Sequence, residues 1–367
     1  MEPLPTTPRE SAGGKIGSQI AFLMFSIVGG TCLILAGMAN SQPIRDWIRN
    51  AAWEQANWKK GIPLFCFNDH FLDSEDRLLH EELPSADFSR GGVYFLGASS
   101  VTWALKLWDL PLECRPLIRN FSMIGTNHAD QYDLVRFLVE QKGLLEAGGE
   151  KTLMIFGVSY HSTHNARVKE SRPGEGFVRL WTRHGCYTVE PDGSIHVSGL
   201  SGPARTIVLE RTKITGLMKE LVNIAYTPFK RTRVQSPQLY NQAWTQVMEA
   251  NYDWNDKIRV DVAAFARMVD YLRSRNAKVV VLRMPQGSWE KNVPFDSAYI
   301  QQMGKVCDSA GVKMYNFSRL VDDDDFADSV HLSPSGVEKF QRAVMGICLD
   351  HLRSTGALPA TDPAGKS

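Results

Sequence analysis

The sequence has no excess of either charge, no closely paired cysteines and no internal repeat. Its 41 lysine and arginine residues against 40 aspartate and glutamate residues give a formal net charge of +1. A general nucleic-acid-binding chain carries a basic excess, so this balance argues against nucleic acid as a partner. The six cysteines form no Cys-x-x-Cys pair, which gives no support to a zinc cluster or a thioredoxin-type motif. The lack of a repeat likewise argues against solenoids and propellers.

The composition is that of a globular protein. Of the 367 residues, 43% are hydrophobic and 22% are charged. That much apolar material can bury a sizeable core, which excludes disorder over the whole chain. A chain of this length fits two domains, or one α/β domain that carries an insertion.

A long uncharged run near the N-terminus predicts a membrane-spanning helix. After a short tail, residues 1–15, the run covers residues 16–39, and residues 20–39 read IAFLMFSIVGGTCLILAGMA. A helix of this length matches the ~30 Å hydrocarbon core of a bilayer. We expect an uncleaved signal-anchor, because the run is longer than the apolar stretch of about 7–15 residues in a usual signal peptide. Cleavage after Ala39 and a buried core helix are the alternatives.

Basic residues lie on both sides of this run, so charge alone does not fix its orientation. They are Arg9 and Lys15 before the run, and Arg45 and Arg49 after it. A signal-anchor leaves the C-terminal bulk outside the cytoplasm, so we expect an inner-membrane protein that crosses once, with the rest of the chain in the periplasm or outside the cell. Trp47, Trp53 and Trp58 fall in a juxtamembrane segment, residues 40–90, where they suit either lipid headgroups or core packing.

Beyond residue 90, short apolar strands alternate with longer helices. The expected strands are residues 92–96, 117–121, 152–156, 278–282 and 312–317. The expected helices are residues 101–108, 129–146, 258–275, 296–310 and 335–352. This alternation predicts an α/β domain over residues 91–353, in which a parallel sheet carries helices on both faces. The tail, residues 354–367, is expected to be disordered.

One stretch, residues 161–255, interrupts the alternation. Residues 187–197 read as a β-hairpin around Pro191, Asp192 and Gly193, and residues 204–226 read as a basic helix. We expect this insertion to shape a substrate cleft. It carries aromatic side chains that either cover the cleft or pack the insertion onto the sheet: Trp181, Tyr187, Tyr226, Tyr240 and Trp244.

Chemically useful side chains follow the ends of the expected strands. They are Ser99 and Ser100 after the first strand, Gly125 after the second, Ser159, Tyr160 and His161 after the third, and Asp328 and His331 before the last helix. Ligands bind beyond the carboxyl ends of parallel strands, so these groups belong at one edge. A serine nucleophile needs a base and a group that orients the base, and Asp328 and His331 can pair. Ser99 could instead cap the helix that follows it.

Three segments resemble sequence blocks of the SGNH (GDSL) hydrolase superfamily, in the same order. Residues 93–99, VYFLGAS, resemble the first block, a hydrophobic strand followed by Gly-Asp-Ser. Residues 120–125, NFSMIG, resemble the second block, which ends in an oxyanion-hole glycine. Residues 328–336, DSVHLSPSG, are similar to the fifth block, Asp-x-x-His before the last helix. The resemblance covers residues 92–350 and implies a three-layer, flavodoxin-like fold.

The resemblance also implies the roles of the site residues. Ser99 would be the nucleophile, His331 the base, and Asp328 the group that orients the base. The oxyanion hole would use the backbone N–H groups of Ser99 and Gly125. Ser159 and Asn127 are further candidate donors to that hole.

The sequence departs from the superfamily pattern in two blocks. Ala98 stands where the first block has aspartate, and Ser159 stands where the third block, Gly-x-Asn-Asp, has an asparagine that donates to the oxyanion. Removing one such donor costs ~10²–10³ in rate. Ser100 is the rival nucleophile, but it lies one residue out of register with Gly-x-Ser.

Together with the anchor, the resemblance implies a membrane-tethered member that acylates cell-envelope polymers, similar to alginate O-acetylation and teichoic acid D-alanylation proteins. We expect an exported serine esterase or O-acyltransferase that acts on acyl groups of an envelope or secreted polysaccharide. Tyr160, His161, Trp181 and Tyr187 would contact the substrate, and no cofactor or metal is expected. Its partners would be the acylated polysaccharide or acyl donor, the membrane, and a polysaccharide synthesis or export complex. The alternative is a non-catalytic polysaccharide-binding or assembly protein with a degenerate SGNH fold.

Three weaker patterns favour plain structural interpretations. His161 and His164 lack a third metal ligand at readable spacing, so a polar loop is favoured. Residues 322–325 lack the glycine and glutamate of a calcium loop and predict a solvated acidic turn. A basic group would form either a solvated helix face or a contact with an anionic polymer or lipid surface: Lys213, Lys219, Lys230, Arg231 and Arg233.

Overall fold

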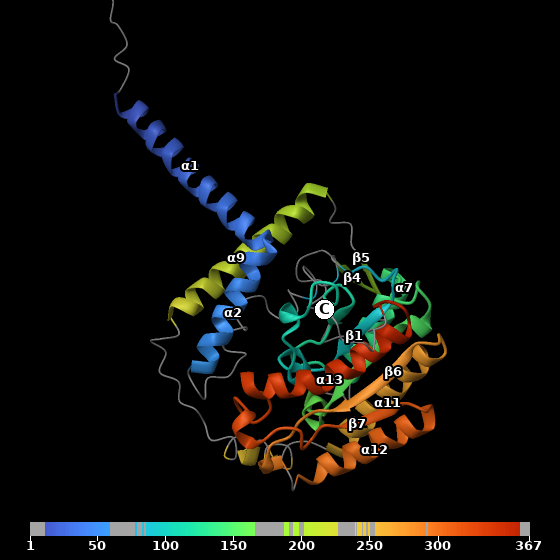
Figure 1. Ribbon diagram of the computed structural model, residues 1–367. Helices are drawn as coiled ribbons and strands as arrows, with labels where there is room; N and C mark the ends of the chain where they lie inside the picture. The colour runs from blue at the N-terminus through green and yellow to red at the C-terminus, as the bar shows by residue number, and fades with distance from the viewer. Residues whose placement is uncertain are drawn as a thin grey trace, which may run out of the picture.

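The computed structural model describes most of the chain. The described residues are 12–58, 78, 83, 86–165, 187–190, 194–197, 202–226, 239, 241–243, 245–246, 249, 254–290 and 293–359. Figure 1 shows a body built around a sheet, from which a long N-terminal helix projects.

Five parallel strands form the central sheet. They are β1 (Gly92–Leu96), β2 (Ile118–Asn120), β3 (Thr152–Val158), β6 (Lys278–Arg283) and β7 (Lys313–Asn316), in the order β2-β1-β3-β6-β7. This is the 2-1-3-4-5 order of doubly wound sheets, whose direction of winding reverses between the first and third strands. Every residue of β1 and β3 is buried, as expected where helices cover both faces. The predicted α/β architecture is confirmed.

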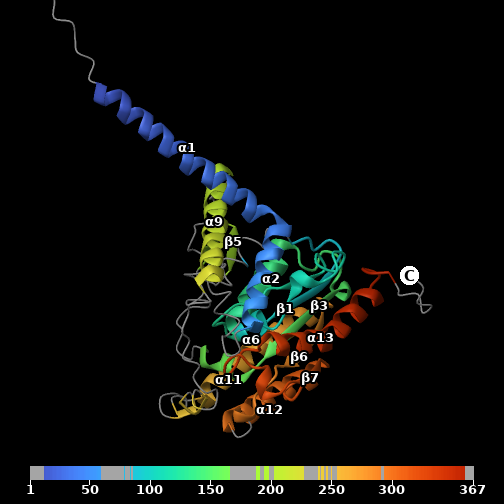
Figure 2. The same cartoon turned by 60° about the vertical axis from the view of Figure 1, so that its left-hand side comes forward.

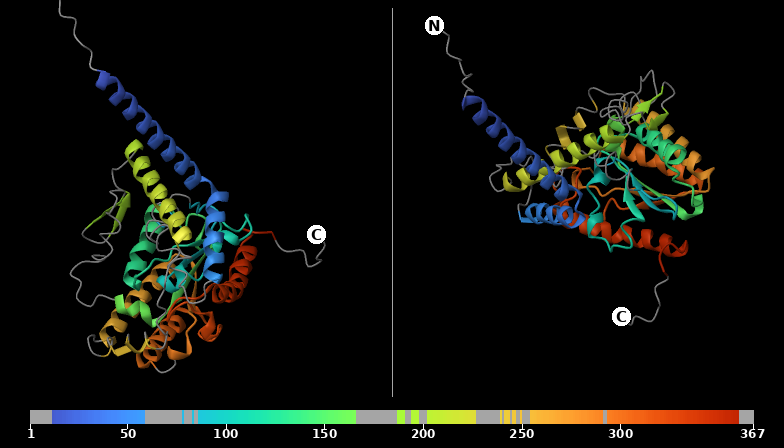
Figure 3. Two further views of the ribbon diagram at one scale, coloured as in Figure 1. Left: turned by 90° about the vertical axis from the view of Figure 1, so that its left-hand side faces the viewer. Right: turned by 90° about the horizontal axis from the view of Figure 1, so that it is seen from above.

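Helices cover the sheet in two layers. One face of the sheet carries α7 (His128–Lys142), α11 (Trp254–Arg273) and α12 (Pro294–Ala310). The other face carries α13 (Pro334–Ser354). Neighbouring strand residues point to opposite faces. Leu96 and Phe156 therefore join the core under α7 and α11, while Phe95 and Ile155 join the core under α13. The right-hand view of Figure 3 shows α13, in red, beneath the sheet and the other helices above it.

Helix α7 is fixed by local signals at both ends. The Asn127 side chain accepts the Asp130 N–H group at 3.0 Å, and the Asp130 carboxylate accepts the Asn127 N–H group in return, which is a capping box. Gly143 follows the helix in the left-handed conformation, at φ 70°. The predicted end at residue 146 is wrong, because Gly143 stops the helix four residues earlier.

The helix predicted over residues 101–108 is also wrong. Only α6 (Ser99–Thr102) and the 3₁₀ turn η2 (Leu107–Asp109) form there. In a continued helix the Lys106 N–H group would donate to Thr102 O, but it donates to the Gln341 side chain at 2.5 Å. The Asn120 amide donates to Thr102 O at 3.4 Å instead. Two side chains from elsewhere in the fold thus satisfy the backbone and end the helix.

The N-terminal run forms one helix, α1 (Ala12–Asn40). Its stretch Gln19–Asn40 is long and apolar enough to cross a membrane. The side chains of Phe22, Phe25 and Leu33 are 74–79% exposed, which contradicts the alternative of a buried core helix. Figures 1 and 2 show α1 leading away from the sheet.

Helix α2 (Gln42–Trp58) ties α1 to the sheet domain. Asp46 pairs with Arg115 at 2.7 Å, and Asn50 accepts the Trp108 indole N–H group at 3.2 Å. Trp53 is buried against the Trp108 ring, whereas Trp47 is 65% exposed. The juxtamembrane tryptophans therefore divide between core packing and the surface, and the Trp58 side chain lies outside the described residues.

The predicted hairpin and helix of the insertion both form. The hairpin pairs β4 (Tyr187–Val189) with β5 (Ile195–Val197), and the helix is α9 (Gly202–Tyr226), which packs on α1 and α2. Residues 166–186 and most of 227–253 lie outside the described part, and with them Trp181, Tyr240 and Trp244.

The C-terminal tail is ordered further than predicted. Leu358 packs in the core under α13, and the Arg90 guanidinium donates to Ala357 O at 3.3 Å. The expectation of disorder from residue 354 is therefore wrong up to Leu358, and residues 360–367 lie outside the described range.

Candidate active site

Ser99 follows the carboxyl end of β1 and is the first residue of the short helix α6. The N-cap of α6 is Ala98, which has extended backbone angles, so Ser99 is the first residue inside the helix and not its cap. This contradicts the alternative that the Ser99 hydroxyl caps a helix. A Cβ atom on Gly97 would lie 3.0 Å from the carbonyl oxygen of Gly157 and still closer to the Val101 side chain. Only glycine therefore permits this close turn out of the strand.

Asp328 and His331 form a bonded pair in the loop between β7 and α13. The His331 Nδ1 atom lies 2.8 Å from Asp328 Oδ2. The backbone N–H groups of Val330 and His331 donate to Asp328 Oδ1 at 2.8 and 2.7 Å. Because Nδ1 faces the carboxylate, Nε2 is on the far side of the ring, which is the orientation that a general base needs.

The same contacts set the protonation state of Asp328. Burial raises the pKa of the Asp328 carboxyl, but the bonds and charge of His331 and the two backbone N–H groups outweigh burial and lower the pKa overall. Asp328 therefore stays ionised at neutral pH, as a residue that stabilises an imidazolium must.

The loop that carries this pair is held from both sides. Buried Asp325 accepts the Ser335 hydroxyl at 2.9 Å and the Lys339 ammonium at 2.6 Å. The Trp289 indole donates to Ser329 O at 3.1 Å. The predicted solvated acidic turn is wrong at Asp325, because that carboxylate anchors the start of α13 and does not face solvent.

The loop after β2 lies against the end of β1. Met123 N donates to Gly97 O at 3.0 Å, and the Thr126 hydroxyl donates to Met123 O at 2.9 Å. Gly125 immediately precedes Thr126 and has a φ of 70°. A Cβ atom at Gly125 would meet nothing within 4 Å. Its conformation, and not crowding, is what favours glycine there. Gly125 thus sits in a loop bonded to the strand end two residues before Ser99.

Asn120 connects this loop to α6. Its amide donates to Val101 O and Thr102 O at 3.3 and 3.4 Å, and its carbonyl oxygen accepts the Ser122 N–H group at 3.0 Å. The residue is 3% exposed. Asn120 therefore positions the short helix that begins at Ser99, a role that the sequence did not reveal.

Asn127, a predicted oxyanion donor, caps α7 with its carbonyl oxygen. Ser159, the other predicted oxyanion donor, follows β3 and is buried. Its hydroxyl accepts the His161 N–H group at 3.4 Å. Neither contact uses the donor that an oxyanion would need. Their oxyanion roles stay predictions.

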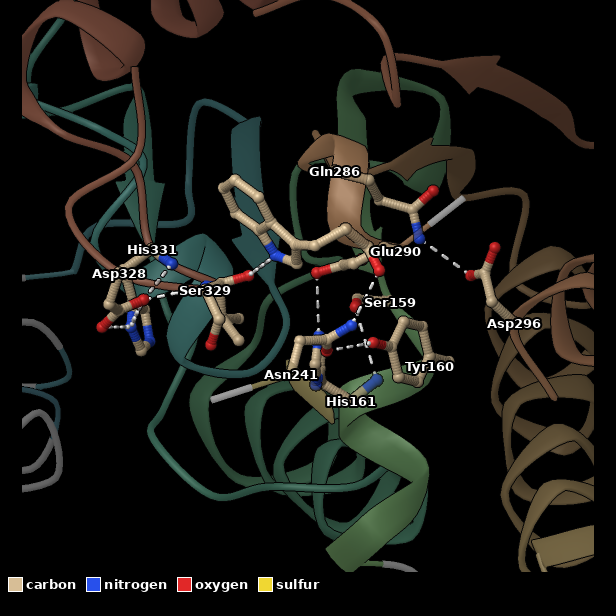
Figure 4. Close-up of polar contacts among 12 residues, drawn as sticks. Ser159, Tyr160, His161, Asn241, Gln286, Glu290, Asp296, Asp328, Ser329 and His331 are labelled. Carbon is tan, nitrogen blue, oxygen red and sulfur yellow. Dashed lines mark hydrogen bonds and ion pairs between the residues drawn. The ribbon is translucent and has the colours of Figure 1, made fainter. Parts of the chain in front are cut away.

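A second polar cluster lies at the ends of β3 and β6. His161 Nε2 lies 3.1 Å from Glu290 Oε1, and the Glu290 side chain is 3% exposed. Tyr160 is fully buried and donates to Asn241 Oδ1 at 3.2 Å, while Asn241 donates to Trp289 O at 3.0 Å. Figure 4 shows the side chains of this cluster in one view with Asp328 and His331. Trp289 links the two sites, because its indole donates to Ser329 O in the loop of Asp328 and His331 and its carbonyl oxygen accepts the Asn241 amide.

A partly buried ion pair lies near this second cluster. The Arg283 guanidinium donates to Asp296 Oδ2 at 2.7 Å, and the Gln286 amide donates to Asp296 Oδ1 at 2.9 Å. Burial raises the pKa of Asp296, and the opposing effect of Arg283 does not cancel it. No sequence signal pointed to Asp296 or to Glu290, since both lie in or beside an irregular loop after β6.

Of the predicted substrate-contacting residues, Tyr160 and His161 lie side by side, with ring centroids 4.1 Å apart, and Tyr187 lies elsewhere. Tyr187 is 1% exposed and its ring packs edge-on against Phe137 of α7, so it belongs to the core. Tyr160 is likewise buried, whereas His161 is partly exposed. Trp181 lies outside the described residues. Within the described part, no three histidine, cysteine, aspartate or glutamate side chains converge to hold a metal.

Comparison with known protein families finds none that matches the chain, and no curated protein matches it. The carboxyl edge of the sheet carries a serine after the first strand, a glycine loop after the second, and an aspartate–histidine pair before the last helix.

Proposed function

We propose that the chain is a serine esterase or O-acyltransferase of the SGNH type. The observation that carries the proposal is the Asp328–His331 pair, with Nδ1 and Oδ2 2.8 Å apart, in a loop at the carboxyl edge where β1 delivers Ser99. The 2-1-3-4-5 strand order supports it, because this order brings the ends of β1 and β3 to the switch point where ligands bind.

The reaction would proceed through an acyl-enzyme. Ser99 Oγ attacks the acyl carbonyl carbon while His331 Nε2 takes its proton, and Asp328 stabilises the resulting imidazolium. The backbone N–H groups of Ser99 and Gly125 donate to the tetrahedral oxyanion. Collapse breaks the ester bond, and the leaving oxygen takes the proton from His331. A second hydroxyl, from water or from a sugar, then attacks the acyl-enzyme and regenerates Ser99.

The proposed setting is the outer side of the inner membrane. Helix α1 would serve as an uncleaved signal-anchor and hold the sheet domain in the periplasm, where acylated envelope or secreted polysaccharide is the substrate class. The contacts of α2 with Arg115 and Trp108 support a tethered sheet domain, which would work beside a polysaccharide synthesis or export complex.

Ester turnover by matched serine variants tests this proposal. The full-length chain in detergent is given a chromogenic acetyl ester, and the initial rate is compared between wild type, Ser99→Ala and Ser100→Ala. The proposal expects loss of turnover in Ser99→Ala and near wild-type turnover in Ser100→Ala. Equal rates in wild type and Ser99→Ala would reject Ser99 as nucleophile.

A non-catalytic polysaccharide-binding or assembly role is the second candidate. Ser159, which replaces an amide donor, favours it, because its hydroxyl already accepts a backbone N–H group. This candidate expects no turnover in the wild type, together with measurable binding of acylated polysaccharide that Ser99→Ala leaves unchanged.

A further inference from the structure

The end of the apolar helix α1 is bonded to the middle of α9. Asn40, the last residue of α1, donates to the Glu210 carboxylate at 2.6 Å. The Lys213 ammonium donates to Asn40 Oδ1 at 2.7 Å and lies 3.0 Å from Glu210. These three side chains form a polar junction where the apolar stretch ends. Figure 1 shows α9 passing beside the end of α1 that lies nearer the sheet domain.

Apolar contacts place α9 level with the last turns of α1. Leu217 of α9 is 1% exposed and packs with Ala39 of α1 and Ile48 of α2. Leu35 of α1 packs against the same cluster. At 1.5 Å per residue, Leu35 lies about 7.5 Å from Asn40 along the helix axis. Helix α9 therefore packs beside the junction of α1 and α2, where the membrane-spanning stretch ends.

A different face of α9 carries an exposed apolar stripe. Ile207, Met218 and Val222 are 67%, 49% and 60% exposed. Spacings of eleven and four residues correspond to about three turns and one turn, so the three side chains share one face. Arg211 is exposed between them. We call Ile207, Arg211, Met218 and Val222 the α9 stripe.

We propose that α9 is an interfacial membrane helix, whose stripe contacts the bilayer that α1 spans. The apolar members would enter the boundary between headgroups and acyl chains, and Arg211 would bind lipid phosphate. The inference rests on the proposal that α1 spans the membrane, and it is independent of the chemistry at Ser99.

Position and charge favour lipid as the occupant of this stripe. Interfacial helices bury their apolar face by about 5–10 Å, which fits a helix level with residues 35–40 of α1. Helix α1 likewise carries exposed apolar side chains, among them Phe25 and Leu33. Helix α9 carries four basic and two acidic residues, a balance that suits anionic headgroups.

The consequence is a fixed height of the active-site edge above the membrane. Helix α2 bonds to Arg115 and Trp108, in the segment that follows the helix of Ser99. Trp47 of α2, 65% exposed, suits the headgroup layer. A single spanning helix allows the domain to swing, whereas a second contact through α9 would hold its orientation.

Site-specific photocrosslinking in vesicles tests the proposal. The full-length chain, carrying a benzophenone amino acid at position 207, 218 or 222, is reconstituted in vesicles of phosphatidylglycerol and phosphatidylethanolamine, irradiated and examined by mass spectrometry. Phe25 of α1 is the matched lipid-exposed position. Gln301, exposed on α12, is the matched solvent-exposed position.

The proposal expects phospholipid adducts at 207, 218, 222 and 25 and none at 301. Arg211→Glu should lower the adduct yield at 218 in these vesicles and have less effect in phosphatidylcholine vesicles, while Arg259→Glu, on α11, should leave the yield unchanged. Lipid adducts at 25 but none on α9, or only protein adducts on α9, would overturn the inference. A failure at 25 would reject both the spanning helix and the interfacial helix.

Discussion

The Asp328 carboxylate accepts both the ring nitrogen and the backbone N–H group of His331, at 2.8 and 2.7 Å. The double contact fixes the ring plane as well as the tautomer, because Nδ1 must carry the proton that it shares with an ionised Asp328. The lowered pKa of Asp328 keeps that arrangement at neutral pH. In the proposed mechanism this histidine would act on the hydroxyl of Ser99, which follows β1 at the same edge of the sheet.

The triad residues are expected to matter for rate and little for stability. Ser99→Ala and His331→Ala should each lower ester turnover by roughly 10⁴-fold or more. Ser99 follows β1 and His331 lies in the loop before α13, and both are partly exposed, so neither change opens a large cavity. The free energy of unfolding should fall by less than about 2 kcal/mol. A larger loss in either variant would make that residue structural.

Asp328→Asn separates positioning from charge. An amide keeps an oxygen for the N–H groups of Val330 and His331 but favours the wrong tautomer of the ring. Turnover should fall, by less than in His331→Ala, with little change in KM. Ser329→Ala is the control, because only its backbone carbonyl is bonded, to Trp289. Wild-type kcat in Asp328→Asn would remove Asp328 from the proposed triad.

Asn120 is expected to act on the reaction through α6. Asn120→Ala leaves Val101 O and Thr102 O without their amide donor, and unmade bonds of buried groups cost about 1–3 kcal/mol. The free energy of unfolding should fall by about that amount, and kcat should fall more than KM rises, because Ser99 loses its fixed position. Ser122→Ala keeps both amide bonds but removes the hydroxyl bonds to Asn120 Oδ1 and Thr102 Oγ1, so it separates the amide bonds from the rest of this network. Unchanged kcat in Asn120→Ala would show that α6 needs no such support.

Acid should remove the contribution of Asp325. Burial raises the pKa of Asp325, but Lys339, Ser335 and the Asp322 N–H group lower it overall. A carboxyl whose pKa is lowered on folding stabilises the fold above its unfolded pKa, about 3.9, and loses this effect as the pH falls through the folded value.

Denaturant unfolding of the chain in detergent, repeated over a pH series, measures this effect. The difference between wild type and Asp325→Asn should be largest near neutral pH and shrink below about pH 4. Asp324→Asn, at the neighbouring exposed position, is the matched control. A difference that is independent of pH, or a loss of equal size in the control, would contradict the anchoring role.

A sugar acceptor distinguishes transfer from hydrolysis. If the acyl group passes to a sugar, an oligosaccharide acceptor should lower the yield of free acid while raising consumption of the acyl donor. His161→Ala should raise the acceptor concentration that gives half this effect by about tenfold, the equivalent of one hydrogen bond. Tyr187→Phe, buried on Phe137, should not change it. If the yield of free acid is the same with and without each acceptor tried, the enzyme is a simple esterase.

The chain should stay in the membrane after extraction with alkaline carbonate. Its sheet domain should be open to protease only from the periplasmic side, because α1 would act as an uncleaved anchor. A reporter fused after residue 355 that is active only in the cytoplasm would overturn this topology. A soluble form that begins at Asn40 would show cleavage and leave the proposed chemistry unchanged.

Regular elements could be predicted from local sequence, and the site only in part. The first strand was predicted at the residues where β1 forms, because an apolar run bounded by glycines needs no tertiary information. The prediction of a helix over residues 101–108 is wrong because side chains distant in sequence bond its backbone. Asn120 donates to Thr102 O, and Gln341 accepts the Lys106 N–H group. The run of four aspartates predicts a solvated turn, but Asp325 is buried and bonded to Lys339 and Ser335, whereas Asp322, 3.7 Å from Lys339, is exposed.

The second cluster shows a different limit. His161 was visible as a residue after a strand, but its partner Glu290 lies 129 positions away in a single 3₁₀ turn, η6 (Ser288–Glu290). Such a pair has no local pattern, since only the crossover from β3 to β6 brings the two loops together. Tyr187 shows the converse limit. An aromatic residue in a hairpin suits a substrate cleft and a core equally well, and Tyr187 packs in the core.

Covalent capture of the nucleophile tests the central claim most directly. The full-length protein in detergent is treated with a fluorophosphonate probe, digested, and the modified residue is located by mass spectrometry. We predict one adduct, on Ser99, which disappears in Ser99→Ala, slows strongly in His331→Ala and persists in Ser100→Ala. No adduct in the wild type, or an adduct that persists in Ser99→Ala, would contradict the account.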